Sequence, residues 1–386
     1  MRAETGQVGV ARPSAGIARA GGPTARAQAD RSQADRSQAD RSQTDRSQTD
    51  RSQADRRRND GASLWRRRPS LRLVTVVLGA IWFVDGLLQL QPSMFTTSFA
   101  TGTLAGAAQG QPWWVYHSVT HVAHDLLPHI AQWNVVFALV QLTIGACLVA
   151  NRALKPALAA SVAWSFGVWW FGEAFGGIFS GNASLVTGAP GAVFLYGLLA
   201  LMAWPRRPSS EVGSAPLAAA EGAVGARWGR LSWAVLWVGS AVLQVLPSNR
   251  SDASISSALR AGASGEPHVL SALTLAAARL VGSHGSGVAI ALAAVEVVVG
   301  LGIFTSRPNL ALAAGIGLSL VFWVVGQQLG GILTGSGTDP NAGPLFVVLA
   351  LTVWKGVPKG VPARARGAAH TTAKGRDGTV GVGAAA

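Results

Sequence analysis

The sequence predicts an all-α membrane protein with eight transmembrane helices. We expect them to form two tandem four-helix repeats in parallel orientation, with a disordered tail at each end. Three observations support this fold class. Of the 386 residues, 49% are hydrophobic and only 13% are charged, against roughly 25% charged in a soluble domain. The chain contains eight continuous apolar segments, and WWFGEAFGGIFSG (residues 169–181) returns 154 residues later as WVVGQQLGGILTG (residues 323–335).

The two tails form the predicted outer domains, residues 1–70 and 355–386, both cytoplasmic. From Gln28 to Arg56 a Gln-Ala/Thr-Asp-Arg-Ser pentapeptide runs six times, and such a tract has too little apolar surface to offset the entropy of ordering. It is either a tether or a tail without a role. Most of the net charge of +14 lies in these tails, where it indicates a topology signal or contact with anionic lipid, and no nucleic-acid partner.

The eight apolar segments define the domains between the tails. They lie at about 71–91, 131–150, 157–179, 189–204, 231–247, 286–305, 309–333 and 342–354. A first membrane repeat therefore covers 71–204, a cytoplasmic linker 205–230, and a second repeat 231–354. A span needs about 20 apolar residues, so the fourth, fifth and eighth segments are short. Two glycine pairs in the third and seventh segments, Gly176-Gly177 and Gly330-Gly331, could unwind locally.

Basic residues in the short connections predict the orientation. Cytoplasmic connections carry an excess of Lys and Arg. With the N-terminus inside, the outer loops hold only Arg250, Arg260 and Arg279, and the inner connections hold Arg152, Lys155, Arg206, Arg207, Arg227, Arg230 and Arg307. We therefore expect a multi-pass protein of a bacterial plasma membrane with both termini in the cytoplasm.

Residue matches between the halves predict the parallel repeat. At an offset of 155 the matching pairs include Trp82 with Trp237, Gln89 with Gln244, His129 with His284, and Arg152 with Arg307. Each half has four predicted spans, an even number, so both halves enter the membrane in the same direction. The implied symmetry is a pseudo-two-fold axis along the membrane normal.

Three carboxyl groups lie inside apolar segments, those of Asp85, Glu173 and Glu296. Their repeat partners are Ser240, Gln327 and Gln141. Together with Gln89 and Gln244, these side chains predict a polar layer near the outer half of the bilayer. It binds a proton, a cation or a polar solute if they face the bundle interior.

The alternative for these polar residues is interhelical hydrogen bonding, worth about 1 kcal/mol or less for each bond. Packing is the preferred interpretation for Gln89, Gln141 and Gln244, whereas Glu173 and Glu296 fit both interpretations equally. For Asp85 a binding role is the preferred interpretation, because its match in the other half, Ser240, has a side chain of a different shape.

The first outer loop contains four histidines, and His117, His121 and His124 share one helix face. Converging on one ion with His129, they would form a Zn or Cu site. Residues seven apart lie about 10 Å apart along a helix, so the site needs another element. The alternative is an interfacial helix with Trp113 and Trp114 in the membrane and the histidines in water. One cysteine, Cys147, excludes an intrachain disulfide.

Two stretches carry a family resemblance. VVLGAIWFVDGLLQLQPSMF (76–95) and AVLWVGSAVLQVLPSN (234–249) each resemble the first helix of DoxX-like membrane proteins, which are small four-helix units. Some members of that family are subunits associated with quinone-linked sulfur oxidation. Residues 169–196 also resemble uncharacterised polytopic membrane proteins of bacteria with GC-rich genomes. The DoxX resemblance implies a quinone ligand and a membrane-protein partner, and it assigns no functional residue.

Three functions fit the sequence. The first is a carrier or channel-like protein for a proton, an ion or a small polar solute. The second is a DoxX-like redox or assembly subunit that binds quinone and has no activity of its own. The third is a membrane scaffold. All three place the chain in the lipid bilayer, with a membrane-protein partner or a second copy as the expected protein contact, and no catalytic motif assigns an enzyme class.

Overall fold

The computed structural model describes residues 69–205 and 218–356. These described residues form helices and contain no strand, apart from an isolated bridge between Pro205 and Gly222. The all-helical prediction is therefore confirmed for this part of the chain. Nearly all of both predicted tails, and Arg206 and Arg207 of the linker, lie outside the described residues. We call residues 69–205 the first half and residues 218–356 the second half.

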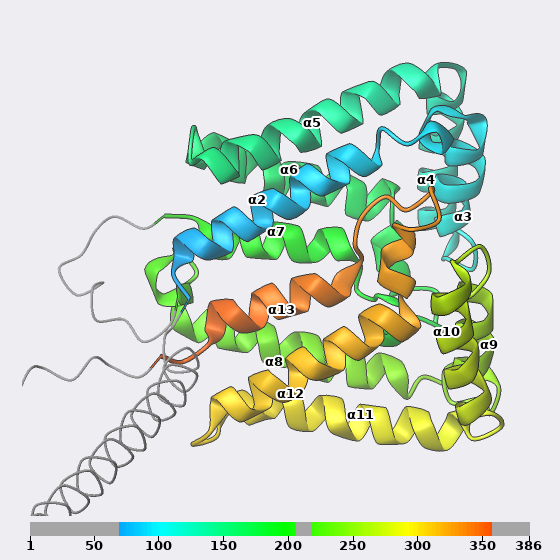
Figure 1. Ribbon diagram of the computed structural model, residues 1–386, viewed down its shortest axis with the longest axis vertical. Coiled ribbons are helices and arrows are strands. Elements are labelled where there is room, and N and C mark those ends of the chain that lie inside the picture. The colour runs from blue at the N-terminus through cyan, green and yellow to red at the C-terminus, as the bar shows by residue number, and fades with distance from the viewer. Residues whose placement is uncertain (1–68, 206–217, 357–386) are drawn as a thin grey trace, which may run out of the picture. The chain divides into compact units, whose positions relative to one another are not determined.

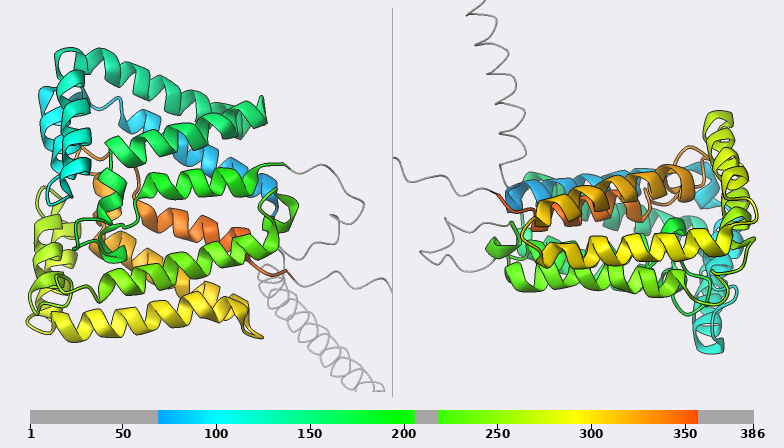
Figure 2. Two further views of the ribbon diagram at one scale, coloured as in Figure 1. Left: turned by 180° about the vertical axis from the view of Figure 1, so that it is seen from behind. Right: turned by 90° about the horizontal axis from the view of Figure 1, so that it is seen from below.

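The longer helices fall into two sets (Figures 1 and 2). One set runs side by side along a common direction: α2 (Leu71–Leu88), α5 (Ile130–Ala150), α6 (Leu154–Phe171), α7 (Ala192–Ala203), α8 (Gly225–Gln244), α11 (Gly285–Leu301), α12 (Pro308–Val321) and α13 (Ala342–Val353). The other set lies across one end: α4 (Trp113–Leu126), α9 (Ser254–Gly262) and α10 (His268–Val281). The α5–α6 and α11–α12 turns lie at the opposite end, on the left of Figure 1.

Shorter helical segments connect these helices. They are Pro92–Phe95, Phe99–Leu104, α3 (Ala105–Ala107), Leu127–His129, Ala174–Gly177, Leu185–Thr187, Ala218–Glu221, Gly302–Phe304, Phe322–Gly326 and Gln328–Gly331. Within the described residues, four helical stretches are long and apolar enough to cross a membrane, at 71–88, 113–150, 285–304 and 308–326. The second of these includes both α4 and α5. The structure therefore shows a protein with several membrane-compatible helices.

Helices α7 and α13 occupy the centre of the bundle. Each has 12 residues, of which nine are buried. At about 1.5 Å per residue they measure about 18 Å, less than the roughly 30 Å of a hydrocarbon core. The outer helices instead expose apolar side chains, including Leu139 on α5 (57% exposed), Val298 on α11 (70%) and Val321 on α12 (55%). An apolar exterior around buried short helices fits a lipid environment.

The two halves share one hydrophobic core. Buried side chains of α2, α7, α8 and α13 belong to a single cluster. Its aromatic contacts include Trp82 on Tyr196 (ring centroids 4.4 Å apart) and Trp237 on Phe346 (5.5 Å). Both short central helices thus pack within one bundle.

Glycines allow α2 and α5 to approach closely. A Cβ atom at Gly145 would lie 2.6 Å from the backbone nitrogen of Phe83, and one at Gly79 would lie 2.7 Å from the Cβ of Leu148. Small residues permit such backbone contact between membrane helices. Arg72 then caps the C-terminus of α5, because its guanidinium donates a hydrogen bond to the Leu148 carbonyl over 2.8 Å.

The helices α6 and α12 both end in the same unusual turn. Each is followed by four consecutive residues with positive φ, Ala174–Gly177 (44°, 60°, 60° and 76°) and Gln328–Gly331 (45°, 57°, 78° and 64°). In both turns a tryptophan indole of the preceding segment donates a hydrogen bond to a proline carbonyl. The pairs are Trp169 with Pro190 (2.7 Å) and Trp323 with Pro340 (2.6 Å). The third and seventh apolar segments are therefore helices that break before their ends.

Candidate functional site

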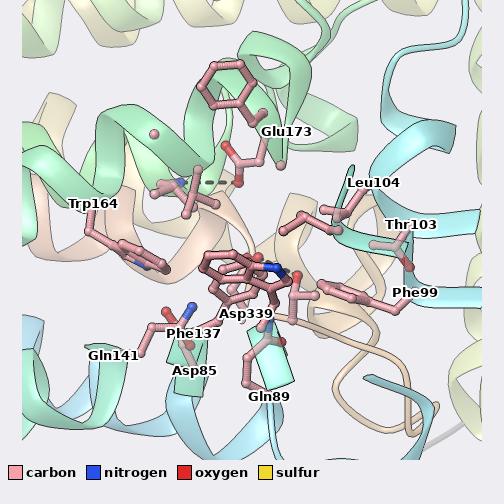
Figure 3. Close-up of a pocket in the computed structure, with 18 of the residues that line it drawn as sticks. Asp85, Gln89, Phe99, Thr103, Leu104, Phe137, Gln141, Trp164, Glu173 and Asp339 are labelled. Carbon is pink, nitrogen blue, oxygen red and sulfur yellow. Dashed lines mark hydrogen bonds between the residues drawn. The ribbon is translucent and has the colours of Figure 1, made fainter. Parts of the chain in front are cut away.

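A cavity of about 300 Å³ lies in the first half between α2, α5, α6 and α7 (Figure 3). One of its lining residues, Asp339, comes from the second half, in the loop that precedes α13. Its polar and aromatic lining residues are Trp82 and Asp85 on α2, Gln89 directly after α2, Phe99 and Thr103 in the segment Phe99–Leu104, Trp133, Phe137 and Gln141 on α5, Trp164 and Phe171 on α6, and Glu173, Thr338 and Asp339 outside these helices.

Three carboxyl groups meet at this cavity, those of Asp85, Glu173 and Asp339. In Figure 3, Glu173 enters from one side, Asp85 and Gln141 enter from the other, and Asp339 lies between. Asp85 is 2% exposed, and the other two carboxyl groups are near enough to influence it electrostatically. The Tyr196 hydroxyl on α7 lies beside it. None of the described residues that line the cavity is Lys, Arg or His, so its wall carries no counter-charge.

Several oxygen atoms of the cavity wall have no hydrogen-bond partner among the described residues. They are Oδ1 of Asp85, Oε1 of Gln89, Oε1 of Gln141 and Oε2 of Glu173. The other carboxyl oxygen of Glu173 accepts a hydrogen bond from the Val193 backbone N–H (3.3 Å). An unpartnered buried polar group costs about 1–3 kcal/mol. Each of these four lining side chains therefore has hydrogen-bonding capacity that no described residue uses.

Asp339 reaches the cavity on a loop that is fastened to the first half. Its carboxyl oxygens accept hydrogen bonds from the Asn341 backbone N–H (2.7 Å) and the Thr338 hydroxyl (2.9 Å). Two first-half side chains bind the same loop, Gln91 to the Gly337 carbonyl (3.2 Å) and Ser93 to the Gly335 carbonyl (2.6 Å). Burial raises the pKa of Asp339, and its two hydrogen bonds oppose that rise.

Sequence reasoning did not find Asp339, because this residue lies between two apolar segments. Two signals pointed toward it. The loop GSGTDPNAG follows the second copy of the repeated motif directly. Its Asp-Pro pair also corresponds in position to Ala189-Pro190, which follows the first copy. A carboxyl group that replaces alanine beside a repeated turn is a candidate site residue.

In the described part of the second half, a loop of the first half contacts the residues that correspond to Gln89 and Glu173. The Gln327 amide donates to the Leu185 carbonyl (3.0 Å) and accepts from the Gly343 N–H (2.9 Å). The Gln244 carbonyl oxygen accepts from the Ser184 hydroxyl (2.6 Å). Only about 30 Å³ of cavity remains there. Gln244 and Gln327, both candidate site residues from the sequence, therefore bond to protein groups.

Glu296 lies apart from the other two predicted carboxyl groups. It is fully buried on α11, and within the described part of the chain neither carboxyl oxygen has a hydrogen-bond partner. Its match Gln141 lines the cavity, whereas Glu296 does not. Of the expected set, the structure brings together Asp85, Glu173, Gln89 and Gln141. Glu296 is separated from them because it belongs to the equivalent place in the other half.

The outer histidines do not converge. The side chains of His117, His121, His124 and His129 are all exposed. His121 pairs with Asp125 at 3.4 Å, with the two side chains 77% and 60% exposed. Across residues 69–205 and 218–356, no group of three or more His, Cys, Asp or Glu side chains is arranged to hold a metal ion. The predicted Zn or Cu site is not formed, because these residues are spread along the helix and no second element completes the set.

Among its described lining residues the cavity combines three carboxyl groups with two amide side chains, and it contains no nucleophile paired with a base. No family model matches the chain, and comparisons with curated proteins and with solved structures found no match either.

Proposed function

We propose that this chain is a multi-pass membrane protein that carries a proton or a small polar solute, with the first-half cavity as its binding site. One observation carries the proposal. Four side chains that line a cavity of about 300 Å³, those of Asp85, Gln89, Gln141 and Glu173, each carry a buried acceptor atom without a described partner. Such unpaired acceptors are costly in a packed scaffold and useful in a binding site.

The membrane part of the proposal comprises eight spans in two parallel repeats within a bacterial plasma membrane, both termini in the cytoplasm. Arg152 and Arg307 lie in the turns at the end opposite α4 and α10, which supports a cytoplasmic position for that end. The matching turns at Ala174–Gly177 and Gln328–Gly331 support the repeat. Broken helices beside a central site also occur in many carriers.

Transport in proteoliposomes tests this proposal. The double variant Asp85→Asn with Glu173→Gln keeps the shape of both side chains and removes two ionisable groups from the cavity. We expect it to lose at least tenfold of the proton flux, read with an enclosed pH dye, or of the uptake of labelled solutes. Glu296→Gln is the matched control, because the same change there lies outside the cavity. A double variant that behaves like wild type in every flux assay would contradict the carrier.

One observation favours the redox-subunit alternative. Trp133, in the cavity wall, is 43% exposed, so a lipid-soluble quinone could reach the cavity from the bilayer. That function, which the DoxX resemblance implies, requires quinone or an oxidoreductase partner to copurify with the chain. The unpartnered indole N–H of Trp164 in the wall could donate to a quinone carbonyl, but the unpartnered acceptors outnumber it, which favours the carrier.

A further inference from the structure

We infer that the first-half cavity takes a small organic cation, a protonated amine with an apolar body. This inference rests on the proposed function and names the class of its solute. It stands on two features of the cavity, acid groups without basic partners and a wall of aromatic rings, and on the replacement of several of these residues in the second half.

The polar part of the wall fits an ammonium group. Asp85, Glu173 and Asp339 supply negative charge when they are deprotonated, and none of the described lining residues is basic. The unpartnered atoms of Asp85, Gln89, Gln141 and Glu173 are oxygen atoms, and an ammonium group carries only donors. An anionic ligand would meet repulsion at this wall, and a neutral acceptor would leave the oxygen atoms unpaired.

The remaining wall fits an apolar, cationic body. Six aromatic rings contribute to it, those of Trp82, Phe99, Trp133, Phe137, Trp164 and Phe171. A cation over an aromatic face gains about 0.5–2 kcal/mol, most strongly over tryptophan. The volume of about 300 Å³ is at the lower end of the range for small-molecule sites, about 300–1,000 Å³. A proton alone needs no such space, and the described carboxyl groups do not converge as a metal site requires.

The second half differs from the first at several of these positions. At the offset of 155, Asp85 corresponds to Ser240, Trp133 to Val288, and Phe137 to Leu292. Near the kinked turn, Gln327 takes the place of Glu173. The second half keeps one ring, Trp237 in the place of Trp82, and has its own acid, Glu296, in the place of Gln141. The half with the larger described cavity thus combines Asp85 and Glu173 with the greater number of these rings, as one ligand that uses both would require.

Direct binding tests this inference with a matched series of probes. Equilibrium dialysis of the purified full chain in nanodiscs would use labelled phenethylamine, phenethyl alcohol and phenylacetate, which share one apolar body. Methylamine supplies the charge without that body. We expect phenethylamine to bind at least tenfold more tightly than each of the other three probes. Equal binding of the alcohol and the amine would overturn the inference, as would preferred binding of phenylacetate.

Variants locate the binding. Asp85→Asn should weaken phenethylamine at least tenfold, and Phe137→Leu, which installs the residue of the second half, should weaken it severalfold. Glu296→Gln and Trp228→Leu, both outside the cavity, should leave it unchanged, and thermal unfolding checks that each variant is folded. If phenethylamine fails to bind while the double variant of the flux assay still abolishes transport, the amine inference is wrong and the carrier stands. If that double variant also transports normally, both are wrong.

Discussion

Glu173 and Gln327 show how one position can serve two purposes. Each accepts a backbone N–H through one side-chain oxygen, from Val193 and from Gly343 respectively. The second terminal atom differs. In Gln327 it is an N–H group that donates to the Leu185 carbonyl, whereas in Glu173 it is an oxygen that lies against Gly191 and has no described hydrogen-bond partner. The glutamine completes a protein contact, and the glutamate leaves one open.

Exchanging these two residues should have unequal effects on stability. Glu173→Gln keeps the bond from Val193, so we expect its unfolding free energy to stay within about 1 kcal/mol of wild type while cavity binding falls. Gln327→Glu removes the donor to the Leu185 carbonyl and faces two oxygen atoms toward each other, which should cost about 2 kcal/mol or more. Unfolding in detergent measures both. Equal losses would show that the two positions do not differ in this way.

Asp339 predicts a pH dependence of stability. Because burial raises its pKa in the folded state, the folded chain binds more protons than the unfolded chain above the ordinary pKa of aspartate. The contribution of this group to stability therefore falls as the pH rises. Asp339→Asn removes the titrating group and keeps an acceptor for the Asn341 N–H.

The measurement is the unfolding temperature of both proteins between pH 4 and pH 8. We expect the variant to gain stability relative to wild type as the pH increases. A difference that stays constant over this range would contradict the assigned burial of Asp339.

At the scale of elements, the turns after α6 and α12 depend on particular glycines. A Cβ atom at Gly176 would lie 2.1 Å from the Pro190 carbonyl oxygen, whereas at Gly177 the nearest atom would be 3.8 Å away. Both residues have positive φ (60° and 76°), which costs a residue with a side chain about 1–2 kcal/mol. The two positions therefore have similar backbone conformations and differ in the room that a side chain would have.

We expect Gly177→Ala to cost about 1–2 kcal/mol and to leave a folded protein. Gly176→Ala should cost several times more, because the Pro190 backbone must move and with it the acceptor of the Trp169 indole. Yield and elution from size exclusion in detergent would show the difference. Similar behaviour of the two variants would mean that the close approach at Gly176 is relaxed in the membrane.

Much of the helical layout follows from local sequence, and the glycine pairs Gly176-Gly177 and Gly330-Gly331 also indicated where two helices are interrupted. Apolar periods predicted helices close to α2, α5 and α11. They extended the third and seventh segments to 179 and 333, whereas the helices end at Phe171 and, after the segment Phe322–Gly326, at Gly326. The left-handed turns that follow depend on contacts with distant carbonyl groups, and an apolar sequence does not reveal such contacts. The apolar periods also placed the start of the fifth segment at 231, although α8 begins at Gly225. Eight spans remain a prediction.

The sequence predicted the residues of the candidate site that belong to the first half. Asp85, Gln89, Gln141 and Glu173 were found because ionisable and amide groups are conspicuous inside apolar segments. Asp339 was missed because its position depends on a loop contact between residues more than 240 apart in the chain. Glu296 was grouped with the others because it matches Gln141 in the sequence repeat. A sequence repeat does not indicate which of the two halves contains a cavity.

At the scale of the whole molecule, labelling of single cysteines tests the orientation. In a Cys147→Ala background, cysteines at the exposed positions Gln109 and Ser264 should react with an impermeant maleimide in intact cells. Cysteines at Arg152 and Ser306, in the turns at the other end, should react only after permeabilisation. Gln109 and Ser264 labelling from opposite sides would contradict the parallel repeat.

The two halves exchange loops, and this has a consequence for how the chain can be divided. Residues 183–185 bind polar groups of the second half, and residues 335–339 bind and line the first. Either half produced by itself would lack the cover for its own polar interior, and the first would lack one of its three acids. A working fragment therefore requires coexpression of its complement, and the two halves depend on each other and are not independent units.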